Sequence, residues 1–200
     1  WQVLLHLVVG DDDMGVDQTR RTILLAAERV FADRGFGSAR VDEIAATAGV
    51  AKSHLYYHFG SKDELLAAII ELRVADLLAA KDRLLADVGA EPEPRTFLER
   101  ALAEVLEPHR DFLRILIVEG ISRPDATAPA WSAVESFLDD SAARYAASGR
   151  PVDAAHRSTL LYFAFLPAAF HVALGRGEDA ALVDGLAAVQ RLVLGRGAPS

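Results

Sequence analysis

The stretch that decides the fold is residues 41–66, which reads VDEIAATAGVAKSHLYYHFGSKDELL. We interpret it as two short helices, 41–48 and about 52–58, separated at Gly49, because the tight turn between them needs a positive φ that glycine adopts at little cost. Ile44 and Ala45 should face inward from the first helix, and Leu55 from the second. The stretch therefore predicts a helix-turn-helix, whose second helix lies on the surface and can enter the major groove of DNA.

The outward side chains of that second helix are the candidates for DNA contact. Each can donate a hydrogen bond, and the aromatic rings can pack on sugars or on a thymine methyl group. A lysine follows at the start of the next helix, where free backbone N–H groups are expected to help it bind a phosphate. The candidates are Lys52, Ser53, His54, Tyr56, Tyr57, His58 and Lys62.

Two pairs of these candidates have other interpretations. His54 and His58 lie at i and i+4, a spacing that also suits a pair of metal ligands, but Asp63 is the only further ligand nearby in sequence, so no metal site is predicted. One ring of Tyr56 and Tyr57 is expected to pack partly against the protein, because adjacent helical residues point about 100° apart.

The rest of the chain reads as helix, because apolar residues recur at spacings of three, four and seven. The first helix is expected over 18–34 and ends at Gly35. Its inward stripe consists of Ile23, Ala27, Val30 and Phe31. Residues 1–13 are interpreted as an extension or a cloning-derived segment.

Two capping-box spacings predict where later helices begin. Ser61 with Glu64 starts a long helix that runs to about residue 88, and Thr96 with Glu99 starts another after the break at 89–94. Residues 122–129 are expected to form a loop. The apolar run 153–174 is expected to be one helix kinked at Pro167, followed by a last helix with an apolar stripe over 182–193.

The formal net charge of −8 argues against a nucleic-acid partner until it is divided along the chain. Residues 14–62 hold seven Lys or Arg and five Asp or Glu, a net charge of +2. Residues 1–13 carry −3, and residues 63–200 carry −7. The region with the helix-turn-helix is therefore locally basic, and the acidic remainder keeps non-specific DNA contact away from other surfaces.

Composition and motifs exclude several classes of protein. The chain has no cysteine, which removes disulfides, cysteine-ligated zinc and thiol chemistry. It has no nucleophile elbow, phosphate loop, zinc-protease motif or dinucleotide glycine pattern, so neither an enzyme nor a cofactor is predicted. The longest apolar stretch, 160–174, is shorter than the ~20 residues of a membrane-spanning helix, and no membrane partner is expected.

Residues 18–66 resemble the TetR family of tetracycline-repressor-like bacterial regulators, through Ile44-Ala45, Ala48-Gly49-Val50, Leu55-Tyr56, His58-Phe59 and Ser61-Lys62. The resemblance implies an all-α cytoplasmic homodimer. Its predicted domains are a helix-turn-helix domain over 14–62 and an effector-binding and dimerisation domain over 63–200, about nine helices in all. The implied function is repression at a palindromic operator, relieved by a small effector. The apolar composition of the C-terminal pocket candidates favours an apolar or amphipathic one. The alternative is an effector-binding protein that acts through a protein partner without DNA.

One position departs from the family pattern. The family usually places a threonine just before the first helix of the motif, and this chain has Arg40 there. A capping box with Glu43 is thereby lost, which weakens the cap by about 1 kcal/mol. The arginine can still reach a phosphate, so Arg40 is added to the DNA-contact candidates.

The C-terminal region supplies candidates for two further roles. Glu119 interrupts an apolar helix and is either an acid paired with an arginine or a polar anchor for an effector. The effector-pocket candidates are Phe97, Leu116, Glu119, Trp131, Phe137, Tyr162 and Phe165. The dimer-interface candidates, on two helices more apolar than one chain can cover, are Leu161, Phe165, Ala169, Val172, Leu182, Leu186, Val189 and Val193.

Overall fold

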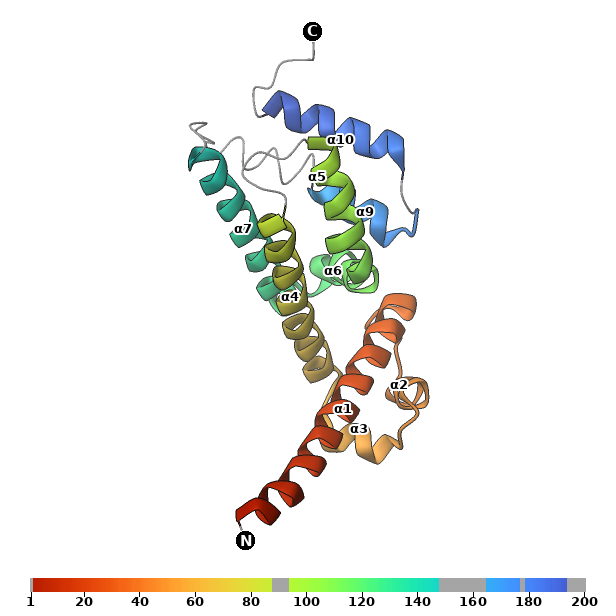
Figure 1. Ribbon diagram of the computed structural model, residues 1–200. Helices are drawn as coiled ribbons and strands as arrows, with labels where there is room; N and C mark the ends of the chain where they lie inside the picture. The colour runs from red at the N-terminus through yellow and green to blue at the C-terminus, as the bar shows by residue number, and fades with distance from the viewer. Residues whose placement is uncertain (1, 88–93, 148–164, 177–178, 194–200) are drawn as a thin grey trace. The chain divides into compact units, whose positions relative to one another are not determined.

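The computed structural model describes residues 2–87, 94–147, 165–176 and 179–193, and every secondary-structure element in these ranges is a helix or a helical turn (Figure 1). They form two compact units: a head, Trp1–Ile70, and a body, Glu71–Ser200. This confirms the all-α prediction for the described residues. None of the helices in these ranges is long and apolar enough to cross a membrane.

The head consists of α1 (Gln2–Arg34), α2 (Val41–Ala48), α3 (Lys52–His58) and the first turns of α4 (Lys62–Asp87). Helix α2 packs on α1 and α3 packs on α2 (Figure 1). The predicted inward stripe of α1 is confirmed, because Ile23, Ala27, Val30 and Phe31 are all buried.

The expected start of the first helix was wrong. Helix α1 begins at Gln2 and not near Gln18, so it includes the segment interpreted as an extension. Residues 2–17 contain no proline, and the two glycines at 10 and 15 each cost only about 1 kcal/mol in a helix, so nothing in this segment forces a break.

Glycines end α1 and α2 as predicted. Gly35 has φ 75° and Gly49 has φ 68°, both in the left-handed region. At the end of α2, the N–H of Val50 donates to Ala45 O at 3.0 Å and the N–H of Gly49 to Ala46 O at 3.2 Å. These bonds satisfy carbonyls that the helix leaves open at its C-terminus.

The start of α2 confirms the lost cap. Arg40 is the N-cap residue and makes no side-chain capping bond. Asp42 and Glu43 lie in the first turn, where carboxylates interact favourably with the helix dipole. Glu43 Oε1 accepts instead from Arg34 Nε at 3.2 Å, which joins α2 to the end of α1.

The start of α4 confirms the first capping box. Ser61 Oγ accepts from the N–H of Glu64 at 3.1 Å, and Glu64 Oε2 accepts from the N–H of Gly60 at 2.9 Å. The head then extends to Ile70, eight residues beyond the predicted boundary at 62. The physical reason is burial, since Leu65, Leu66, Ile69 and Ile70 are all at most 1% exposed.

The body begins within α4 and continues through α5 (Pro94–Arg100), a π-helical turn (Ala101–Leu106) and a 3-10 turn (Glu107–His109). Then come α6 (Arg110–Ser122), α7 (Pro124–Ala147), α9 (Leu166–Ala173) and α10 (Ala180–Val193). Its main core joins buried residues of α4, α5, α6, α9 and α10, among them Leu84, Leu98, Leu113, Val172 and Leu186.

An ion-pair cluster holds α4 to α7 inside the body. Lys81 Nζ lies 2.9 Å from Asp140 Oδ2 and 3.0 Å from Asp82 Oδ1, while the lysine side chain is only 8% exposed. Burial alone would lower the pKa of Lys81, but hydrogen bonds to the two carboxylates outweigh it and raise that pKa above its ordinary value. The lysine is therefore a charged cross-link between the two helices.

Two boundary predictions in the body were wrong. The expected loop 122–129 is reduced to Arg123, because α7 already begins at Pro124. Proline suits the first turn of a helix, and Pro129 is accommodated one turn later. The second capping box also fails: α5 begins at Pro94, and Glu99 accepts from Arg95 Nε at 2.8 Å instead of capping a helix.

Residues that favour helix termini lie at the start and end of α9 and at the start of α10. Pro167 lies in the first turn of α9, where proline is tolerated, and the part of the predicted kinked helix before it, 153–164, lies outside the described residues. Gly175 ends α9 with φ 67°. Asp179 Oδ1 then accepts from the N–H groups of Ala181 and Leu182, which caps α10.

Candidate nucleic-acid interface

The helix-turn-helix of the head has the predicted geometry. Ile44 and Ala45 of α2 and Leu55 of α3 are at most 4% exposed, and Gly49 makes the turn between the helices. Because these apolar residues hold the inner face of α3, its other residues point outward.

Six of the eight predicted contact residues lie on α3, and among them only His58 is half-buried. Lys52, Ser53 and His54 are exposed, and Tyr57 is 79% exposed. The rings of Tyr57 and His58 meet edge to face, with centroids 5.2 Å apart. Tyr56 is 47% exposed, so it is the ring of the tyrosine pair that packs more against the protein. The helix thus presents ammonium, hydroxyl, imidazole and phenol groups on one surface.

An ion pair joins this surface to α2. Lys52 Nζ lies 2.7 Å from Asp42 Oδ1, and both side chains are more than half exposed. The hydrogen bond to Asp42 raises the pKa of Lys52, so the lysine is fully charged at neutral pH. An exposed pair of this kind is worth little energy, so the lysine can exchange the carboxylate for a DNA group.

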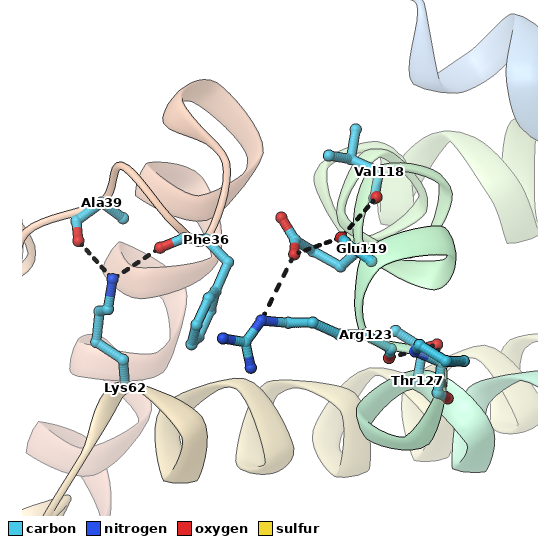
Figure 2. Close-up of polar contacts among 9 residues, drawn as sticks. Phe36, Ala39, Lys62, Val118, Glu119, Arg123 and Thr127 are labelled. Carbon is cyan, nitrogen blue, oxygen red and sulfur yellow. Dashed lines mark hydrogen bonds and ion pairs between the residues drawn. The ribbon is translucent and has the colours of Figure 1, made fainter.

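Arg40 and Lys62 differ sharply in their surroundings. Arg40 is exposed and precedes α2 in an extended conformation. Lys62 is half-buried, and its Nζ donates to Phe36 O at 2.8 Å and to Ala39 O at 2.9 Å (Figure 2). The sequence predicts that Lys62 binds a phosphate, and this stays a prediction. In the structure its ammonium donates to two carbonyls of the turn between α1 and α2.

Sequence reasoning missed three contacts in the head. They are the Lys52–Asp42 pair, the Arg34–Glu43 pair, and Arg20, whose guanidinium carbon lies 5.1 Å from the ring centroid of Phe59. No sequence signal identifies them, because each joins residues of different elements at separations that depend on how the helices pack.

Three effector-pocket candidates come together in the body. Trp131, Phe137 and Phe165 all pack against the buried Val134 of α7. Phe97 packs against the main core, as Phe165 also does, and Leu116 is buried. Tyr162 lies outside the described residues. The structure therefore brings together an aromatic cluster from α7 and the residue preceding α9.

Glu119 has the surroundings of a paired acid. Its Oε2 accepts from Ser122 Oγ at 3.3 Å and lies 3.9 Å from Arg123 Nε, on the same helix end (Figure 2). It is only 7% exposed. These contacts match the pairing interpretation given for it from the sequence.

The structure corrects several dimer-interface candidates. Ala169, Val172 and Leu186 are at most 4% exposed because they form part of the body's own core, so they have no surface left for a second chain. Phe165, Leu182 and Val189 are half-buried. Leu161 and the side chain of Val193 lie outside the described residues.

Two exposed apolar residues on α9 were missed. Phe170 on α9 is 48% exposed and Leu174, the residue that caps α9, is 64% exposed, and they lie four residues apart on the face opposite the core. The signal was present in the sequence: once positions 168, 169, 172 and 173 are assigned to the core, the stripe at 170 and 174 must face outward.

The head thus has the architecture of a helix-turn-helix DNA-binding domain attached to a helical body. Comparisons with known proteins agree, since residues 23–69 match the family model described as bacterial regulatory proteins, tetR family. The chain is 33% identical over 105 residues to the uncharacterized HTH-type transcriptional regulator TtgW of Pseudomonas putida, which covers 52% of this chain and 76% of TtgW. This chain belongs to the tetR family of bacterial regulatory proteins.

Other relatives and structures are consistent with that membership. The chain is 48% identical over 63 residues to the transcriptional activator FasR of Mycolicibacterium smegmatis, across 32% of this chain and 29% of FasR. Several further relatives are named transcriptional repressors. A TetR-like regulator from Rhodococcus sp. RHA1 has a similar fold, with a TM-score of 0.66, 28% identity, and coverage of 88% of this chain and 93% of that one. The chain spans at most half the length of the first curated relatives it matches.

Proposed function

We propose that this chain is a DNA-binding transcriptional repressor that binds a palindromic operator as a homodimer. The observation that carries the proposal is the surface of α3, where Lys52, Ser53 and His54 are exposed and have side chains that can form hydrogen bonds. These three are the proposed contacts to base edges. Arg40 and Tyr56 are the proposed phosphate contacts, and Tyr57 and His58 complete the surface that enters the groove.

Repression requires two heads on one duplex. In a symmetric dimer, the two α3 helices must lie about one helical turn of DNA apart, ~34–36 Å, to read both halves of a palindrome. An effector that favours a different spacing releases the DNA, provided that it binds the two states with different affinity. Helix α4 belongs to both head and body, so it is the proposed lever between them.

The proposed effector is a small apolar or amphipathic molecule. The support is the aromatic cluster of Trp131, Phe137 and Phe165, which offers apolar contact area with few competing polar groups. Glu119 is the proposed polar neighbour, although its contacts to Ser122 and Arg123 already occupy part of its carboxylate. An effector that left operator affinity unchanged at saturation would contradict this part of the proposal.

DNA binding is tested by a salt series. The protein is used to select duplexes from a randomised pool. Its affinity for the selected duplex and for a mixed-sequence duplex is then measured across about 50–200 mM salt. We expect a palindromic selected site and an affinity that falls steeply with salt, because phosphate neutralisation releases counterions. If neither duplex binds at the lowest salt, the chain acts without DNA and the alternative of a protein partner gains support.

The dimer is proposed to use the exposed stripe of α9. The Phe170→Glu variant places a charge on this stripe and is expected to give a monomer by sedimentation at micromolar concentration, because burying an unpaired carboxylate is costly. The matched control is Ile121→Glu on α6, where the side chain is 89% exposed, and its mass should stay that of the wild type. A dimer in both variants would show that the interface lies elsewhere.

A further inference from the structure

The contact that distinguishes Lys62 from every other DNA-contact candidate is its pair of bonds to the turn at 35–39. Its Nζ donates to Phe36 O at 2.8 Å and to Ala39 O at 2.9 Å, and it lies 4.7 Å from the ring centroid of Phe36. The acceptors stand 26 and 23 residues before the lysine. Figure 2 shows the side chain rising from the start of α4 to this turn.

The two bonds from Lys62 stabilise this turn. Residues 35–39 follow α1 and precede α2, so their carbonyls are not part of a helical ladder. Phe36 and Ala39 are both buried, and buried backbone carbonyls without partners are costly. Bonds from a charged donor are stronger than neutral ones, and the phenyl face adds a cation–π contact. Lys62 therefore holds the turn and the start of α4 together.

Arg40 is the next residue along the chain from Ala39. It is exposed, precedes α2, and is a proposed phosphate contact. No side-chain cap holds its backbone at the start of α2. Its carbonyl accepts from the N–H groups of Glu43 and Ile44 at 3.1 Å, so α2 holds the C-terminal side of Arg40, and the turn that Lys62 fixes holds its N-terminal side. Two of the three N–H donors of Lys62 are already engaged, which leaves little of the ammonium for a phosphate.

We propose that Lys62 is a positioning residue for Arg40: it fixes the turn at 35–39, and its effect on DNA affinity passes through the arginine and not through a phosphate contact of its own. The inference rests on the proposed DNA-binding function. It also predicts that the start of α4 and the start of α2 move together when the protein changes state.

The test is a double-mutant cycle on a mixed-sequence duplex of about 30 base pairs. The variants are Lys62→Met, which keeps the aliphatic chain and removes the ammonium, Arg40→Met, and the two combined. Each single variant is expected to bind about three- to tenfold more weakly, with a salt slope shallower by about 0.9 for Arg40→Met. The combined variant is expected to bind no more weakly than Arg40→Met alone.

A second readout needs no DNA. In the free protein, the N–H of Ala39 donates to Gly35 O within the turn, and the N–H of Phe59 donates to Leu55 O at the end of α3. In Lys62→Met, exchange of the Ala39 amide is expected to accelerate about tenfold more than exchange of the Phe59 amide. A general loss of head stability would accelerate exchange of both amides by the same factor.

Three results would overturn the inference. They are additive losses in the double variant, full affinity in Arg40→Met, and equal acceleration of the two amides. A wild-type protein that binds neither duplex defeats the proposed function itself. That outcome can be told apart from the three results above. The two affinity results require a wild type that binds DNA, and the amide result is measured in the free protein.

Discussion

The Ile44→Ala variant is expected to lose about 3 kcal/mol of unfolding free energy and to lose DNA binding. Ile44 lies on α2 and is fully buried. Truncating a buried isoleucine to alanine removes its transfer free energy and leaves a cavity, which together cost about 2–5 kcal/mol of stability. A unit as small as the head has only a few kcal/mol of stability, so this loss is a large fraction of the total. The measurement is chemical denaturation followed by circular dichroism, with duplex binding by anisotropy.

The matched control for this variant is Leu25→Ala on α1. Leu25 is 42% exposed, so truncation removes a similar number of apolar atoms without creating an internal cavity. The control is expected to lose well under 1 kcal/mol and to bind DNA normally. If the two variants unfolded at the same denaturant concentration, the assignment of Ile44 to the core of the head would be contradicted.

The His54→Ala variant is expected to lose discrimination before it loses binding. His54 is exposed on α3 and is a proposed base contact, so its removal should cost about 1–3 kcal/mol for each half-site of the selected palindrome. Binding to the mixed-sequence duplex should change little, because phosphate contacts dominate there. The measurement compares the two affinities and repeats the selection, which should show a relaxed preference at one or two base pairs.

Thr47→Ala serves as the control for His54→Ala. Thr47 is exposed on α2, and its hydroxyl donates to Glu43 O within the same helix, so this substitution removes a polar side chain without touching α3. It should leave both affinities unchanged. Equal losses on the selected and mixed-sequence duplexes in His54→Ala would assign the histidine to phosphate contact or to folding.

The local features of the head were predictable because they depend on neighbours in sequence. The turn at Gly49, the inward positions of Ile44 and Leu55, and the capping box at Ser61 all arise within a few residues. The partners of Lys62 were not predictable in the same way. Its two acceptors are backbone carbonyls more than twenty residues away, and a backbone carbonyl leaves no trace in the amino-acid sequence.

In the body, the apolar spacing of the sequence could not separate a dimer interface from a core. The apolar periodicity of residues 165–193 correctly predicted helices, but a two-chain interface and a one-chain core require the same spacing. The sequence predicts that Val172 and Leu186 lie at the interface, and only the packing of α5 and α6 against them assigns them to the core. Phe170 and Leu174 then remain on the outside, which moves the proposed interface to the opposite side of α9.

The position of the boundary between the two units inside α4 constrains how such a protein can be assembled from parts. The first turns of α4 supply Leu65, Leu66, Ile69 and Ile70 to the head, so a head cut after residue 62 would lack a whole layer of its interior. Genetic recombination that gave this head a new sensor would succeed only if the crossover lay beyond Ile70. Because no loop separates the units there, the incoming piece would also have to continue the helix in register.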